Sequence, residues 1–234
     1  MNLRQIMNEI PGYDSPGMRC LAQARARGFM PNQGESALLE GLVQRSSQFQ
    51  GKARSAASLY NTPLDRDSFR LSGESRNAGD ANPLVQMQVM KMILEKSRDL
   101  GDADRAILLA TARLESGFNP DAASPITSAA GIFQFVSKTG ASYGLDKSNV
   151  FEAEHNIDAG ISLYQDNVYK LPSRHKFSGL DLEAKGELAY ALHHDGPSLA
   201  YGGREVAKEG LVPYLGGYLE LVRKYDTVCA TDIR

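Results

Sequence analysis

A single glutamate, Glu115, ends an apolar helical segment in the stretch LESGFNP, residues 114–120. The Gly-Phe-Asn-Pro that follows cannot easily continue a helix, so the carboxylate lies in the last helical turn. Its face is shared with Ala112, Thr111 and Leu108, and it is mostly apolar. Poor hydration on that face favours the protonated carboxyl, and the negative end of the helix dipole acts in the same direction. The pattern therefore predicts a general acid.

The side chains around Glu115 suit the binding of sugars. Ser116 follows the acid directly, and Gly-Ile-Phe-Gln-Phe at 131–135 supplies one amide and two aromatic rings. An amide can bind sugar hydroxyl and acetamido groups, so Gln134 is the best candidate for a polar contact. Phe133 and Phe135 are either faces for pyranose rings or core residues. An exposed helix-terminal glutamate without a function is the alternative that these neighbours argue against.

Four motifs follow one another in the order found in one enzyme family. They are Glu-Ser with Phe-Asn-Pro at 115–120, Gly-Ile-Phe-Gln-Phe at 131–135, Asn-x-x-x-Gly-x-x-Leu-Tyr at 156–164, and Ala-Leu-His-His-Asp-Gly-Pro at 191–197. The set resembles the soluble-type (SLT) lytic transglycosylases, relatives of goose-type lysozyme. The last motif is similar to the form found in phage-type relatives. The resemblance covers roughly residues 85–225.

The resemblance implies an enzyme that cuts peptidoglycan strands without a cofactor. Glu115 would protonate the oxygen between N-acetylmuramic acid and N-acetylglucosamine, and would then take the proton of the muramyl C6 hydroxyl. That hydroxyl attacks C1 and closes a 1,6-anhydro ring. The resemblance also implies substrate-binding roles for a group of residues: Ser116, Phe133, Gln134, Phe135, Tyr190 and His193. For Ser116, helix capping is the alternative.

Two adjacent histidines, His193 and His194, lie in the last motif. Neighbouring helical residues point about 100° apart, so the pair does not easily share one metal ion. No HExxH pattern or Cys/His set accompanies them, and we predict no metal site. The resemblance places His193 where the common motif has a tyrosine. It would hydrogen-bond near the Glu115 carboxyl or the sugar.

A second carboxylate would change the reaction. Glycoside hydrolysis ordinarily uses two carboxyl groups, and Asp121 and Asp195 lie in or beside the cleft motifs. Goose-type relatives hydrolyse with a water-positioning aspartate, so a muramidase is one alternative. A module of a virion or secretion apparatus that binds peptidoglycan without cleaving it is another.

The elements that position these residues are mainly helical. Apolar spacing and stop signals predict helices over 83–101, 102–116, 156–171, 182–194 and 212–225, with at most a small β-hairpin around 124–135. The middle of the helix over 102–116 is apolar nearly all round, which predicts a buried central helix. We expect a lysozyme-like helical domain over residues 81–234.

Residues 1–80 precede that domain. We expect a helix at 34–50 and a linker from 61 to 84, because the latter stretch is rich in Asn, Asp, Ser, Gly and Pro. The role of this segment is targeting, docking or wall binding. Through it the protein would meet secretion machinery, a virion or an immunity protein. Nucleic-acid binding is disfavoured by the net charge of −2, the pI of about 6.1 and the lack of a known motif.

The sequence also bears on location. The N-terminus has no apolar core of a Sec signal peptide, and no run of eighteen apolar residues predicts a membrane span. We expect synthesis in the cytoplasm and action in the periplasm or cell wall after injection, lysis or non-Sec export.

Overall fold

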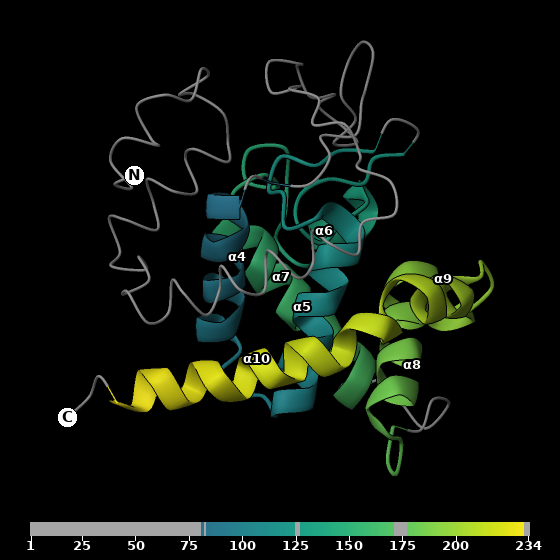
Figure 1. The fold of residues 1–234 in the computed structure, drawn as a ribbon. Coiled ribbons are helices and arrows are strands. Elements are labelled where there is room, and N and C mark those ends of the chain that lie inside the picture. Colours follow the sequence, from purple (N-terminus) through teal and green to yellow (C-terminus); the bar gives the residue numbers. More distant parts are fainter. Residues whose placement is uncertain (1–80, 82, 125–126, 171–176, 232–234) are drawn as a thin grey trace, which may run out of the picture.

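The computed structural model describes residues 81, 83–124, 127–170 and 177–231, and the fold is mainly helical (Figure 1). The predictions for 1–80, and the division of the chain at residue 80, lie outside these residues and stay predictions. The α-helices are α4 (Pro83–Lys96), α5 (Asp102–Ser116), α6 (Ser137–Ser142), α7 (Ala153–Gln165), α8 (Leu182–Asp195), α9 (Gly203–Gly210) and α10 (Val212–Thr231). A π-helical turn, η1 (Asp166–Lys170), continues α7, and a 3-10 turn, η2 (Gly196–Ser198), follows α8.

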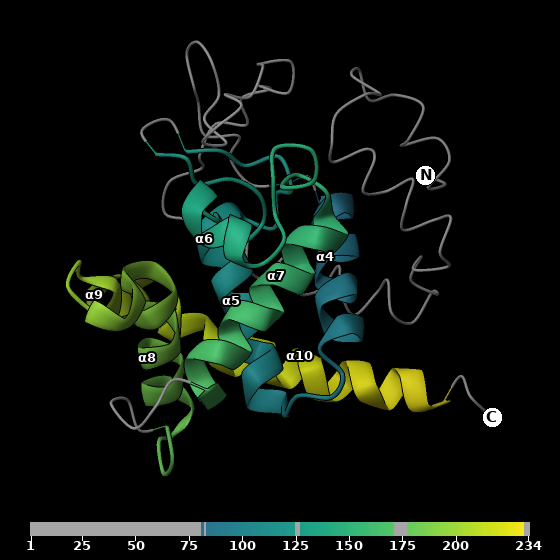
Figure 2. The same cartoon turned by 180° about the vertical axis from the view of Figure 1, so that it is seen from behind.

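Helix α5 is the central element, as its sequence predicts. Helices α4, α7, α8 and α10 all pack against it, and every residue from Asp104 to Ala112 is buried. Figures 1 and 2 show α10 crossing both α4 and α5. Two contacts hold α10 in this position. Arg105 of α5 makes a bidentate ion pair with Asp226, and the Tyr225 hydroxyl donates to Glu95 of α4. Because α5 is clamped from several sides, its carboxyl end is a rigid platform for Glu115.

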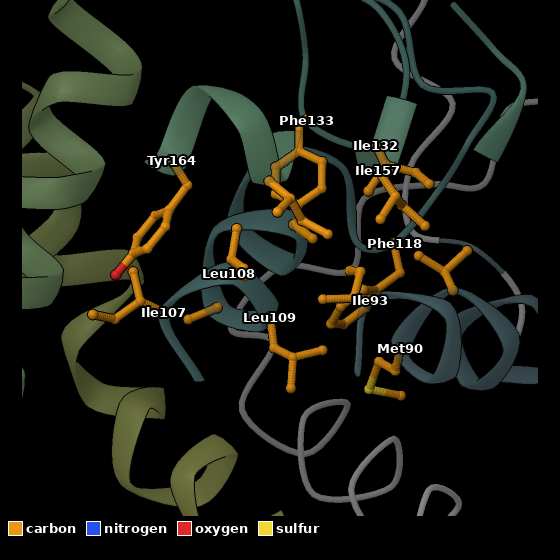
Figure 3. Packing of buried hydrophobic residues seen from close by; sticks show 14 of the residues in the cluster. Met90, Ile93, Ile107, Leu108, Leu109, Phe118, Ile132, Phe133, Ile157 and Tyr164 are labelled. Atoms are coloured by element: carbon orange, nitrogen blue, oxygen red, sulfur yellow. The ribbon is translucent and has the colours of Figure 1, made fainter. Parts of the chain in front are cut away.

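The apolar core surrounds α5 (Figure 3). It joins side chains of α4, α5 and α7 to those of the loop between α5 and α6, among them Met90, Ile93, Ile107, Leu108, Leu109, Phe118, Ile132, Phe133, Ile157 and Tyr164. The loop residues are therefore held by the same packing as the helices. No helix of the described residues has the length and apolar character needed to cross a membrane.

The sequence predicts at most a small β-hairpin around 124–135. The described residues of this stretch form only isolated β-bridges. Ala130 pairs with both Ala123 and Phe135 in antiparallel fashion, without forming a named strand. Left-handed backbone at Gly131 (φ 79°) and Gln134 (φ 48°) turns the chain back between these pairs. A β-ladder cannot extend through so tight a reversal of the chain. The segment is therefore a loop held together by the two bridges of Ala130.

A buried carboxylate joins four elements at the amino end of α5. Asp104 accepts hydrogen bonds from the hydroxyls of Tyr164 (2.5 Å) and Tyr169 (2.6 Å), and it pairs with Lys185 at 2.5 Å. The π-helical turn brings two tyrosines five residues apart onto one acceptor. Burial acts to raise the pKa of Asp104, but these three donors together hold it below its usual value.

We expect Asp104→Ala to lower the free energy of unfolding by about 2–4 kcal/mol, since it strips two hydroxyls and a half-buried ammonium of their acceptor. The loss should shrink in acid. A carboxylate with a depressed folded pKa stabilises above its unfolded pKa of about 3.9, and that stability disappears as the pH falls through the folded value. Urea unfolding at neutral and acidic pH measures both effects. Asp158→Ala is the control, because the exposed pair of Asp158 with Lys96 is worth at most about 1 kcal/mol.

Candidate active site

Glu115 lies in the last turn of α5, where the sequence places it. Helix α5 ends because Gly117 takes a left-handed conformation (φ 59°) and its N–H returns to the carbonyls of Ala112 and Arg113. Phe118 is also left-handed (φ 59°), and its ring is buried. The Glu115 side chain is 14% exposed, so it is largely shielded from solvent while still reaching the surface. Partial shielding of this kind suits a proton donor to a bound substrate.

Ser116 supports the turn after Glu115. Its hydroxyl donates to the Ala112 carbonyl at 3.1 Å and accepts from the Asn119 N–H at 3.2 Å, and the residue is buried. Asn119 in turn accepts the N–H of Asp121 at 2.9 Å. These contacts agree with the helix-capping alternative for Ser116. A direct contact of Ser116 with substrate stays a prediction.

Helix α7 holds the loop at 130–135 through two residues of its motif, the polar Asn156 and the small Gly160. Asn156 is fully buried; its Oδ1 accepts the Phe133 N–H at 2.9 Å, and its Nδ2 donates to the Val150 carbonyl at 2.9 Å. One helical turn on, Gly160 leaves room for the Phe133 ring, because a Cβ there would lie 2.4 Å from that ring. The spacing of four residues between Asn156 and Gly160 thus serves one purpose, the placement of Phe133.

Gln134 sits in a left-handed conformation that its own side chain stabilises. Its Nε2 donates to the carbonyls of Gly131 (2.9 Å) and Ala122 (3.1 Å). Such a backbone costs energy in a residue with a Cβ and persists only where the surroundings fix it. The Oε1 atom accepts no hydrogen bond from the residues that the structure describes. A contact of Gln134 with substrate, through this Oε1 atom, stays a prediction.

His193 comes from α8 and brings the motif of that helix to Glu115. Its Nε2 lies 3.0 Å from the Phe133 carbonyl and 3.7 Å from Glu115 Oε1. The rings of Phe133 and Phe135 contact the imidazole edge-on, both at 6.3 Å between centroids, and Tyr190 lies at 6.2 Å. All three rings are buried. The aromatic residues therefore enclose His193, which agrees with the core interpretation of Phe133 and Phe135.

The contacts of His193 define its protonation. A carbonyl can only accept, so Nε2 carries the hydrogen that it donates to Phe133. Burial lowers the pKa of His193, and the nearby Glu115 carboxylate offsets this only in part. His193 is therefore neutral near pH 7, with an N–H beside the acid and no full positive charge.

We expect acid to destabilise the wild-type protein more than a His193→Gln variant. A histidine whose folded pKa is depressed stabilises fully above its unfolded pKa of about 6.5, and that stability is lost as the pH falls toward the folded value. Glutamine keeps an N–H donor for the Phe133 carbonyl but does not titrate. The difference in unfolding free energy between the two proteins should therefore shift against the wild type as the pH falls from about 7.5 to about 5. Parallel stability profiles would show that His193 does not titrate in this range.

Asp121 and Asp195, the candidate second carboxylates, lie near the ends of two different helices, α5 and α8. Asp121 is buried in the turn after α5. Asp195, at the end of α8, accepts the N–H of Gly203 and the Nδ1–H of His194, the latter at 2.6 Å. Burial acts to raise the pKa of Asp195, but hydrogen bonds from His194, Gly203 and Tyr201 hold it below the usual value. Asp195 is thus an ionised anchor for the chain after α8, and a catalytic role for either aspartate stays a prediction.

One aromatic neighbour of the site was missed in the sequence. The Tyr143 ring packs against Phe135 at 6.0 Å, and its hydroxyl donates to Asp166 at 3.0 Å. Burial and this carboxylate raise the pKa of Tyr143 to about 12. Tyr143 lies between motifs and has no periodic partner, so no pattern could have indicated it.

The comparison with protein families shows which family this part of the chain resembles. The model of the transglycosylase SLT domain matches residues 92–179. This part of the chain is an SLT transglycosylase domain. The match includes Glu115, the loop at 130–135 and both motif residues of α7, which together form the geometry described above. The SLT family cleaves glycosidic bonds of peptidoglycan, and the fold is lysozyme-like.

The SLT match ends before α8, yet α8 completes the site. His193 reaches Glu115 from outside the matched residues, so the phage-type form of the last motif stays a prediction. No curated protein and no solved structure matches the chain.

Proposed function

We propose that the protein is a peptidoglycan lytic transglycosylase in which Glu115 acts first as general acid and then as general base. The observation that carries the proposal is the place of Glu115: largely shielded, at the rigid end of the central helix, and facing a neutral donor on His193. A carboxyl group in this position can give a proton to a bound substrate and then take one back. The SLT match supports peptidoglycan as the substrate.

The reaction needs one carboxyl group and no water. Glu115 gives its proton to the β-1,4 glycosidic oxygen, the bond from muramyl C1 to that oxygen breaks, and N-acetylglucosamine leaves with a free hydroxyl. The Glu115 carboxylate then takes the proton of the muramyl C6 hydroxyl while O6 bonds to C1. This step forms the 1,6-anhydro ring and restores the protonated acid.

The contacts of Asp195 argue against this residue as the second carboxylate of a hydrolase. Its oxygens receive the N–H groups of His194 and Gly203, so its hydrogen-bonding capacity serves the protein rather than a catalytic water. His193 Nε2 lies 3.7 Å from Glu115 Oε1, beyond hydrogen-bond range, while its hydrogen is donated to the Phe133 carbonyl. A small shift of the imidazole would bring this donor to Glu115 when negative charge appears there after the first proton transfer.

Release of soluble fragments from purified peptidoglycan tests this proposal. The full chain should release muropeptides continuously, and release should saturate with the amount of wall material. A protein that sediments with the walls but releases nothing under any condition would be a binding module, and the catalytic proposal would be wrong.

A further inference from the structure

An exposed tyrosine lies in the turn between η2 and α9. Tyr201 is 76% exposed, the highest value among the large hydrophobic residues in the described part of the chain. A scattered surface aromatic needs no explanation by itself. The backbone of the turn that carries Tyr201, however, is held by specific contacts.

Asp195 anchors this turn from inside. Both of its carboxylate oxygens accept the Gly203 N–H at 3.1 Å, and the backbone of Tyr201 also hydrogen-bonds to it. Leu199 (φ 51°) and Gly202 (φ 84°) take left-handed conformations on either side of Tyr201. A buried ionised anchor and two left-handed residues fix the backbone, so the ring projects from a rigid base.

The same anchor orients a second exposed group. His194 donates its Nδ1–H to Asp195 at 2.6 Å, and its side chain is 36% exposed. Its Nε2 makes no hydrogen bond to any residue in the described part of the chain. Asp195 therefore orients the imidazole of His194 and holds the backbone that carries the exposed Tyr201 ring.

This pair is connected to the proposed active site through the buried ring of Tyr190. The Tyr190 ring lies between the two histidines, with centroids 5.9 Å from His194 and 6.2 Å from His193. His193 in turn reaches Glu115 at 3.7 Å. An unbroken series of contacts thus leads from the acid to the surface that bears Tyr201.

We propose that Tyr201 and His194 form a glycan subsite that binds the amino-sugar chain beyond the bond being cleaved. A rigid, exposed aromatic ring offers an apolar face to a pyranose while its hydroxyl stays hydrated. The fixed His194 Nε2 is a partner for a sugar hydroxyl, acetamido or carboxylate group. The identity of the occupant rests on the proposed function, since a polymeric substrate extends past Glu115 in both directions.

The composition of the chain allows a direct binding test, because it contains no tryptophan. Tyr201→Trp in a Glu115→Gln background introduces a single indole and prevents turnover. Titration with soluble N-acetylated peptidoglycan tetrasaccharides and longer chains should give a saturable shift of emission to shorter wavelength. Adding His194→Ala should weaken that binding by about tenfold. Tyr169→Trp is the matched control, because Tyr169 is exposed and contacts Asp104 at the opposite end of α5.

Kinetics provide the second arm. Tyr201→Ala should raise KM for polymeric peptidoglycan by about tenfold with kcat retained, while Tyr201→Phe keeps the wild-type values. If the emission of the indole introduced by Tyr201→Trp does not change on titration with glycan chains, or if KM is unchanged in Tyr201→Ala, the subsite proposal is wrong and the proposed function stays intact. Undiminished cleavage by Glu115→Gln would overturn the proposed function whatever the indole reports.

Discussion

Glu115→Gln is expected to reduce peptidoglycan cleavage by about 10²–10⁴-fold, the usual contribution of a proton-transfer residue. Glutamine has nearly the shape of glutamate and leaves the turn at Gly117 intact, but it cannot give up a proton and take it back. Both halves of the proposed reaction depend on that exchange. Initial rates of muropeptide release from purified walls measure the effect.

The control must separate loss of chemistry from loss of fold. Glu209→Gln in α9 makes the same chemical change at an exposed position, and its rate should equal that of the wild type. Helical circular dichroism and thermal midpoint of Glu115→Gln should match the wild-type values. A Glu115→Gln protein that is folded and cleaves at more than about a tenth of the wild-type rate would exclude Glu115 as the acid.

Gly131→Ala should be the most damaging small substitution near the site, costing about 3 kcal/mol of unfolding free energy or more. The left-handed backbone (φ 79°) is strained by about 1–2 kcal/mol in any residue with a Cβ. The new methyl would also lie 2.2 Å from the Asn156 amide and 2.5 Å from the Val150 carbonyl. Asn156 is fully buried and cannot move without releasing Phe133, so the overpacking adds about 1–3 kcal/mol.

Gly144→Ala isolates the conformational part of that cost. Gly144 has almost the same backbone (φ 78°), but no atom lies within 4 Å of a Cβ built there. We expect a loss of only about 1–2 kcal/mol for Gly144→Ala. Chemical denaturation of both variants gives the comparison. Equal losses would show that the contact of Gly131 with Asn156 does not constrain the loop.

The long helices could be predicted because their apolar spacing reflects burial. Helix α5 was predicted with its observed bounds, since apolar residues cover its whole circumference and Gly117 marks its end. Helix α8 likewise ends within one residue of its prediction. These elements owe their form to local propensity and the core, and both act in the same direction.

The short elements and the loop could not be predicted from periodicity. Helix α6 has six residues and α9 has eight, too few for an apolar repeat to appear. The bounds of α7 also shifted: it begins three residues before its prediction, and its last turn becomes the π-helical η1, where Tyr169 reaches Asp104. Contacts distant in sequence decide such features.

The roles within the site divide in the same way. The position of Glu115 follows from one helix, and the sequence alone was enough to predict it. The function of Asn156 is visible only when the backbone of residues 130–135 is folded around its amide. For His193, the family resemblance implied a position near Glu115, whereas its donation to Phe133 and its aromatic surroundings depend on the tertiary fold.

The most direct test is digestion of purified peptidoglycan by the full chain in water enriched in the heavy oxygen isotope, with mass spectrometry of the muramyl ends. Attack by the C6 hydroxyl uses no water, so the products should carry 1,6-anhydromuramyl ends without the heavy isotope. Reducing muramyl ends that carry the heavy isotope at C1 would show hydrolysis and contradict a single-glutamate transglycosylase.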